Sequence, residues 1–225
     1  MTLLEKAEKK PEKSKGIVAL MVALLGTIGI VVYTFYGSRD LRGMDIAMLF
    51  VIVGVAAYGV MQTIIRGLLT AVAIYLGTAI AGTFYYVLRP YARSFLNVLG
   101  NIGLSRPPLG EVDTSALALS FAFAAVLLWL VLELLFRAAL PETDIPFLGF
   151  ADRIGGMFVY LAIGLVVAAL LFTVIGYGAA GRAAHNKASL RPEFNQVMKL
   201  TYQTQSFWFP RHPPAIYAYD QDLRD

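Results

Sequence analysis

The sequence predicts an all-α integral membrane protein, a bundle of about five transmembrane helices. Hydrophobic residues make up 58% of the 225 residues and charged residues only 15%, whereas a soluble domain is roughly half apolar and roughly a quarter charged. The mean hydropathy is +0.65. The apolar residues also fall into five long runs instead of being spread along the chain, which is typical of a membrane protein.

Each apolar run lacks Asp, Glu, Lys and Arg and has about the length that a helix needs to cross a bilayer, ~20 residues. Backbone groups in lipid must satisfy their own hydrogen bonds, and runs this long lack the alternation of barrel strands, so we expect helices. The runs are 16–38, 46–65, 67–88, 114–132 and 154–181.

The first run is longer than the apolar core of a secretory signal, which has about 7 to 15 residues. The stretch YTFYGSRD that ends it offers no small-residue cleavage site. We therefore expect residues 16–37 to be retained as an additional transmembrane helix.

Three segments lie outside the runs: a basic N-terminal tail at 1–15, a loop at 89–113 and an aromatic, proline-rich tail at 181–225. The apolar patch 95–104 of the loop is too short to span, so it forms a short interfacial helix or a plain loop. The aromatic residues of SFWFPRHPPAIYAYD follow no helical or strand period. We expect them to rest at the interface or pack back on the bundle, with docking of a partner as the less favoured alternative.

Arg66 and Gly67, in IIRG, separate two apolar runs with almost nothing between them. A tight turn between spans needs a charge that avoids hydrocarbon and a glycine that permits unusual backbone angles, so IIRG predicts a helical hairpin. The favoured interpretation is that Arg66 anchors the tip at the lipid headgroups. The alternative is a functional role, and we hypothesise an ion pair with Asp152, which would tie the hairpin to the last span.

Glu133 is the acidic residue of LWLVLELLFR and precedes Arg137 by four positions. This spacing puts the two side chains on one helix face, so we expect them to pair near the membrane interface. The alternative is that Glu133 faces a polar cavity in the bundle, with Gln62 and Thr63 as further polar candidates.

Aspartates open two of the spans. Asp45, in RGMDIAMLF, is expected to cap its helix, because a carboxylate complements the positive helix N-terminus. Asp152 and Arg153, in GFADRIGG, repeat this pattern at the last span.

Small residues recur four positions apart in several spans, the spacing that lets helix backbones approach closely in lipid. We expect Gly77, Gly82 and Gly164 to lie at such helix contacts.

Basic residues flanking the spans are nearly balanced between the two sides, so the orientation depends on the first helix. Five lysines precede that helix and two arginines follow it, which favours a cytoplasmic N-terminus. Five spans then put the Arg66 turn in the cytoplasm and the C-terminal tail outside.

Two stretches resemble the colicin V production protein (CvpA) family. MDIAMLFVIVGVAAYGVMQTIIRGLLTAVAIYLGTAIAGTFYY is similar to the family's first hairpin, which opens with an aspartate and turns through arginine and glycine. FLGFADRIGGMFVYLAIGLVVAALLFTVI is similar to its last span, which Asp-Arg introduces. The resemblance implies a four-helix membrane domain at 44–180 with a longer loop between its second and third helices.

The chain departs from the family pattern in two ways. A helix at 16–37 precedes the four-helix unit, and YLAIG lacks the basic-glycine pair that members often carry midway along the last span. The trypsin-like domain that some members append is not expected here.

The chemistry of the residues argues against an enzyme. Cysteine is absent, which removes disulfides, thiol catalysis and thiolate metal sites. Two histidines, His185 and His212, lie in the tail, and no Ser/His/Asp set accompanies them, so we expect no protease, metal site or cofactor.

The resemblance implies a link to toxin production or export and to envelope maintenance, in a bacterial inner membrane. The small-residue packing and the few intramembrane charges favour a non-enzymatic scaffold or accessory subunit. The alternative is a component of a transporter or channel, which needs a polar path through the bundle. The expected partners are the lipid bilayer, a second copy of the chain or other membrane proteins, and not nucleic acid.

Overall fold

The computed structural model describes residues 3–101, 112–140, 149–209 and 216–217. Helices make up nearly all of these ranges, and no strand occurs in them, which confirms the predicted all-α class. The helices are α1 (Leu3–Tyr36), α2 (Gly43–Gly59), α3 (Ile64–Asn101), α4 (Val112–Ala139), α5 (Phe150–Tyr177), α6 (Ala179–Lys187) and α7 (Arg191–Gln205), followed by a 3-10 turn at Ser206–Trp208.

Four helices contain segments long and apolar enough to cross a membrane. These segments are Gly16–Tyr36, Ile64–Val98, Ser115–Ala139 and Ala151–Tyr177. Helix α2 is as apolar but has only 17 residues, which is the lower limit of the usual range of about 17 to 25. The five apolar runs of the sequence therefore correspond to four long helices and one short one.

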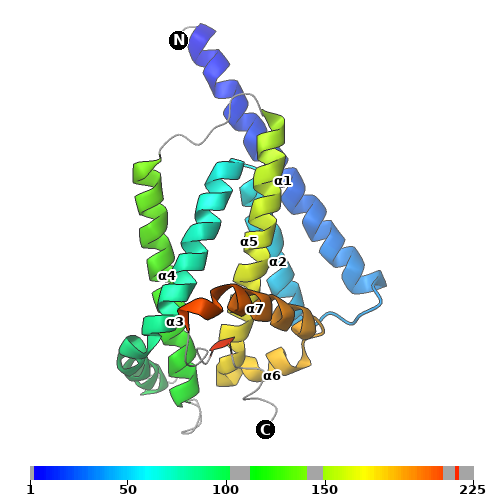
Figure 1. Cartoon of the computed structure of the whole chain (residues 1–225). Helices are drawn as coiled ribbons and strands as arrows, with labels where there is room; N and C mark the ends of the chain where they lie inside the picture. Colours follow the sequence, from blue (N-terminus) through cyan, green and yellow to red (C-terminus); the bar gives the residue numbers. More distant parts are fainter. Residues whose placement is uncertain (1–2, 102–111, 141–148, 210–215, 218–225) are drawn as a thin grey trace.

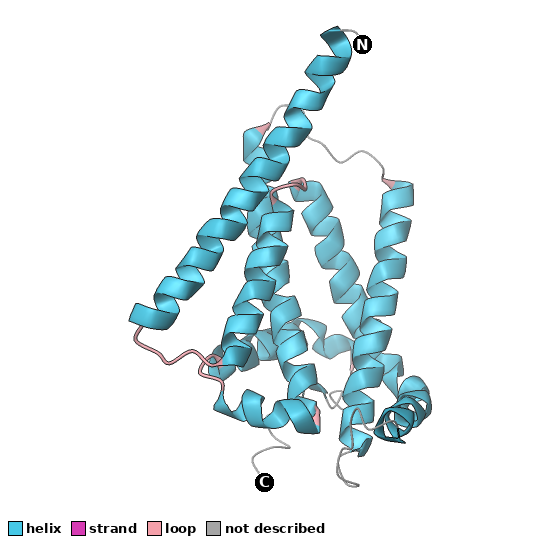
Figure 2. Ribbon diagram, turned by 180° about the vertical axis from the view of Figure 1, so that it is seen from behind, coloured by secondary structure: helices cyan, strands magenta, loops and turns pink. Residues whose placement is uncertain are grey.

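The four helices after α1 form the bundle. Helix α3 packs along α4, α2 packs along α5, and α3 also contacts α5, whereas α4 and α5 touch each other only slightly. Helix α1 leans against α2 and diverges from the other helices, as Figures 1 and 2 show from opposite sides. The bundle thus consists of two tightly packed pairs joined through α3.

The two ends of the bundle differ. The start of α1, the α2–α3 turn, the end of α4 and the start of α5 lie at one end (Figure 1). Helix α6 and the start of α2 lie at the opposite end. The compartment that each end faces stays a prediction.

Helices α6 and α7 occupy the segment that the sequence analysis treats as a tail. In α7 the buried residues Phe194, Met198 and Gln205 recur at helical spacing. Phe194 and His185 both pack on Phe172 of α5, with ring centroids 4.9 and 4.4 Å away. The sequence analysis did not predict this amphipathic helix, because the polar composition of the segment resembles that of a tail.

Two of the described aromatic residues after α7, Phe209 and Tyr217, pack back on the protein, one of the two favoured expectations, whereas Phe207 and Trp208 are exposed. The Tyr217 hydroxyl donates to Oε1 of Gln205 at 2.6 Å, and its ring lies edge-on to Phe121 of α4. Burial raises the pKa of the Tyr217 phenol. Residues 210–215 and 218–225 lie outside the described ranges.

Helix α3 continues past the expected end of its span at residue 88. It runs through Pro90 to Asn101, and its last turns bend aside from the bundle (Figure 1). Proline lacks a backbone N–H and clashes with the preceding turn, which kinks a helix. The first part of the expected 89–113 loop is therefore helical, and residues 102–111 lie outside the described ranges.

Glycines mark the closest helix contacts. A Cβ at Gly77 would lie 3.1 Å from the backbone nitrogen of Trp129 on α4, and one at Gly164 would lie 3.2 Å from Cα of Ile52 on α2. Gly82 is also buried. A side chain at Gly77 or Gly164 would have to push the facing helix backbone away by at least a few tenths of an ångström.

We expect Gly77→Leu and Gly164→Leu each to destabilise the protein by about 1–3 kcal/mol, the usual cost of overpacking. Gly54→Leu is the matched control in α2, because nothing lies within 4 Å of its Cβ position. Thermal unfolding in detergent measures the effect. Equal melting temperatures for the three variants would contradict the close-contact assignment.

Candidate functional site

The α2–α3 turn is built around Thr63 and the Arg66-Gly67 pair. The Thr63 side-chain oxygen accepts the backbone N–H of Arg66 at 3.2 Å, the bond by which an N-cap residue satisfies the first turn of a helix. A Cβ at Gly67 would lie 2.9 Å from Cγ1 of Val159 on α5. The turn therefore caps α3 and brings its first turn against α5.

The tip of this hairpin rests on a pair of glycines at the start of α5. A Cβ at Gly156 would lie 2.5 Å from the carbonyl oxygen of Gln62, and one at Gly155 would overlap Ile64. Asp152, one turn earlier, accepts the backbone N–H of Ile64 on Oδ1 at 2.9 Å. The last span thus holds the first hairpin through backbone contacts.

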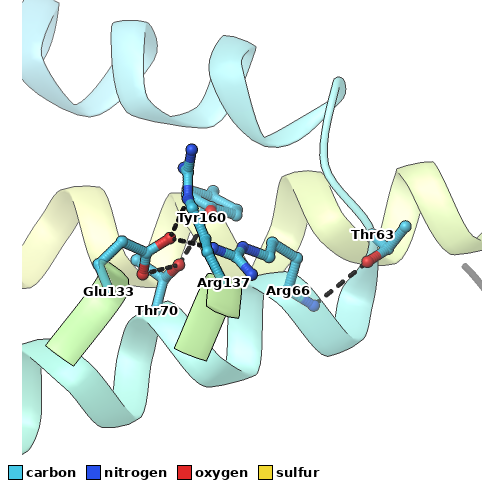
Figure 3. A network of polar contacts seen from close by, with 6 residues as sticks. All are labelled: Thr63, Arg66, Thr70, Glu133, Arg137 and Tyr160. Carbon is cyan, nitrogen blue, oxygen red and sulfur yellow. Dashed lines mark hydrogen bonds and ion pairs between the residues drawn. The ribbon is translucent and has the colours of Figure 1, made fainter. Parts of the chain in front are cut away.

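Glu133 of α4 is the centre of a buried polar cluster (Figure 3). Its Oε1 accepts Nη2 of Arg66 at 2.8 Å and Nε of Arg137 at 3.3 Å. Its Oε2 accepts the hydroxyl of Thr70 at 3.0 Å. Both oxygens of this carboxylate are therefore satisfied, as a buried charge requires.

Tyr160 extends the cluster to α5. The Tyr160 and Thr70 hydroxyl oxygens are 3.1 Å apart, and because Thr70 donates its proton to Glu133, Tyr160 is the donor between them. The Tyr160 ring also meets Tyr58 of α2 edge-on, with centroids 5.5 Å apart. The cluster consequently joins side chains from all four helices of the bundle.

The structure corrects the hypothesis about Arg66. Its partner is Glu133 and not Asp152, whose carboxylate accepts a backbone N–H instead. Arg66 is also buried, so the favoured anchor at the lipid headgroups is wrong. A carboxylate reaching Arg66 from α4 makes burial of the guanidinium tolerable, because the attraction between the two charges offsets the cost of removing them from water.

Asp45 lies fully buried in the first turn of α2 and caps that helix. Its Oδ2 accepts the backbone N–H of Arg42 at 2.8 Å. The same carboxylate accepts the N–H of Ser189 at 2.9 Å and of Leu190 at 3.0 Å. Asp45 thus also fastens the start of α7 to the start of α2.

A second contact joins α7 to the linker between α1 and α2. Arg39 and Glu193 form an exposed ion pair there, and the hydrogen bond from Arg39 holds the pKa of Glu193 below its ordinary value. Arg153, by contrast, is half-buried at the start of α5 and makes no ion pair with the residues that the structure describes.

A pocket of about 560 Å³ lies between α2, α3, α4 and α5. Apolar side chains form most of its lining, and the polar residues of the Glu133 cluster lie at one end. Glu133 therefore faces a cavity, but one with mostly apolar walls instead of the polar cavity of the alternative, and the expected i, i+4 pair with Arg137 is present. Gln62 and Thr63 do not line the pocket.

Metal-ligand chemistry has no support in the described part of the chain, where no three potential ligands come together. His185 is completely buried against Phe172. His212 lies outside the described ranges.

Sequence reasoning missed three polar residues that connect helices, Thr70 and Tyr160 of the bundle and Gln205 of α7. Thr70 follows Arg66 by four positions, a spacing that places both on one helix face and could have indicated the cluster. Gln205 donates to the Tyr75 carbonyl at 2.9 Å and to Thr78 at 2.7 Å. No pattern in the sequence indicates that contact, which joins segments 127 residues apart.

The comparisons with known proteins give one match. A family model described as colicin V production protein matches residues 44–199, which is more than two thirds of the chain and includes α6 and part of α7. No curated protein and no solved structure matches.

We expect Asp45→Asn to loosen α7, because an amide group cannot accept all three backbone N–H groups and leaves buried donors unsatisfied, at about 1–3 kcal/mol. Hydrogen exchange at Ser189 and Leu190 should quicken, and the melting temperature should fall. Asp40→Asn is the matched control, because the Asp40 side chain is exposed. Unchanged exchange in Asp45→Asn would contradict the assigned role.

Proposed function

Because the chain belongs to the colicin V production protein family, we propose that it is a non-enzymatic accessory subunit that holds another integral membrane protein. The proposed location is the bacterial inner membrane, with the N-terminus and the α2–α3 turn in the cytoplasm. The five lysines that precede the first apolar run support this orientation.

The observation that carries the proposal is the position of α1. Only 6% of the residues in its apolar window are buried, against 50% in α3. It meets the bundle at Gly26, where a Cβ would lie 2.5 Å from Val53 of α2. Helix α1 also precedes the family-matched residues 44–199.

The open side of α1 suits a transmembrane helix of a partner. Leu25 and Phe35 are 65% and 77% exposed. No atom lies within 4 Å of the Cβ position of Gly29, so a partner backbone has room to approach closely there. The partner that fits is therefore an apolar helix of another membrane protein.

A non-enzymatic role is supported by the contacts of the buried charges. Arg66 and Glu133 bind each other, and Asp45 and Asp152 bind backbone N–H groups. Each of these groups has a structural partner that would compete with a substrate.

A photocrosslinking amino acid at Leu25 should give a discrete adduct with a larger membrane protein in intact cells. The same amino acid at Phe123 of α4, which is 61% exposed, should not. Gly29→Leu should reduce the adduct, because the added side chain obstructs the close approach.

Two results would overturn this proposal. An adduct containing only a second copy of the chain would make α1 a self-association helix. Equal adducts from both positions, or none from Leu25, would leave α1 facing lipid alone.

A component of a transporter or channel is the second candidate, favoured by the presence of Glu133 at the pocket. Such a role requires water along the pocket. A single cysteine at Val167, which lines it, distinguishes the two candidates in this cysteine-free chain. Labelling by a water-soluble thiol reagent would favour the transporter, whereas protection would favour the accessory subunit.

A further inference from the structure

The pocket between the helices is long and parallel to α4. Its lining on α4 extends from Phe121 to Arg137, and sixteen residues of helix span about 24 Å. Its volume of about 560 Å³ lies within the range of sites that bind small ligands, about 300 to 1,000 Å³. This shape suits an extended hydrocarbon chain lying along the membrane normal.

The pocket opens sideways to the surroundings of the bundle. Val126, Leu130 and Leu134 of α4 line it and are 50%, 47% and 66% exposed. On the other side, Tyr58 of α2 and Leu171 of α5 line it and are also exposed. The opening follows from the packing of α4 on α3 and of α5 on α2, with little contact between α4 and α5. A lipid chain can therefore enter without crossing water.

One end of the pocket carries an exposed arginine, Arg137. On the described parts of the helices that line the pocket, three arginines and two carboxylates lie toward this end: Arg66, Arg137, Arg153, Glu133 and Asp152. Arg137 is two residues from the end of α4, and its side chain is 55% exposed. Its Nε bonds Glu133, its guanidinium also hydrogen-bonds the side chain of Tyr58 on α2, and its terminal nitrogens point away from the Glu133 carboxylate (Figure 3).

The geometry at this end suits a phosphate. A guanidinium has five N–H donors in a planar fork that matches phosphate oxygens. Deeper in the pocket, the indole N–H of Trp129 is buried and has no hydrogen-bond partner among the described residues.

We propose that the pocket holds an acyl chain of an anionic phospholipid whose phosphate is bound by Arg137. The apolar walls accommodate the chain, the lateral opening admits it from the bilayer, and Arg137 selects the charge of the headgroup. This site goes beyond the proposed accessory role and does not depend on it, since α1 is not among the elements that line the pocket.

Tryptophan fluorescence provides the test, because Trp129 lines the pocket and the chain has only two tryptophans. A Trp208→Phe background leaves Trp129 as the single reporter. The full chain is reconstituted in phosphatidylcholine vesicles that contain a small fraction of lipid with brominated acyl chains, which quench tryptophan on contact. Brominated phosphatidylglycerol should compete for the pocket about fivefold better than brominated phosphatidylcholine, the preference that one arginine gives near an anionic lipid.

Two substitutions separate the headgroup from the chain. Arg137→Gln should remove the preference for phosphatidylglycerol and retain quenching by both lipids. Gly54→Phe should reduce quenching by both, because Gly54 lines the pocket and has open space at its Cβ position. Arg153→Gln is the control: it removes the same charge at the same end of the bundle, outside the pocket lining, and should retain the preference.

Several outcomes would overturn the proposal. Equal quenching by the two lipids in the unsubstituted pocket would exclude headgroup selection. If Arg137→Gln and Arg153→Gln both lost the preference for phosphatidylglycerol equally, that preference would come from general surface charge and not from Arg137. Displacement of the brominated lipid by inorganic phosphate would point to a site for a free anion. Unchanged quenching in Gly54→Phe would place the lipid contact of Trp129 outside the pocket.

Discussion

The buried contact between the Arg66 guanidinium and the Glu133 carboxylate holds the helices together at one end of the bundle. A lone charge in a membrane helix costs roughly 2.5 to 3.5 kcal/mol at mid-bilayer and less toward the ends. Here two such charges neutralise each other at 2.8 Å. Thr70 and Tyr160 extend the contact to α5, so the position of each helix depends on the others.

Two aspartates act in a related way through backbone groups. Asp45 and Asp152 both lie in the first turn of a membrane helix, where a carboxylate is stabilised by the helix N-terminus. Each also accepts the N–H of a second segment, the start of α7 for Asp45 and the start of α3 for Asp152. The same residue type in the same helical position thus fastens opposite ends of the bundle.

Much of this fold could be predicted from the sequence, because length, hydropathy and small-residue spacing act within one helix. The membrane class, the hairpin at Arg66 and the Glu133–Arg137 pair all follow from such local patterns. The partner of Arg66 could not be predicted in this way, because Glu133 is 67 positions away. No local pattern indicates which face of α4 contacts α3. The helices α6 and α7 were missed because their polar composition resembles that of a tail.

The pocket likewise depends on how helices pair and not on any motif. Helix α4 packs along α3, and helix α5 packs along α2. The space between these two pairs has apolar walls, with the Glu133 cluster at one end. The cluster therefore has two consequences: it fixes the helices, and it leaves a charged end on an otherwise apolar pocket.

A double-mutant cycle on Arg66 and Glu133 tests most directly whether the ion pair organises the bundle. Arg66→Met and Glu133→Leu are compared singly and together by thermal unfolding in detergent. Glu133→Leu leaves the buried Arg66 without its carboxylate and should cost about 3–5 kcal/mol. Arg66→Met should cost less, because Glu133 keeps Arg137 as a cation, and the double variant should cost far less than the sum. Costs that simply add would contradict the central role of the pair.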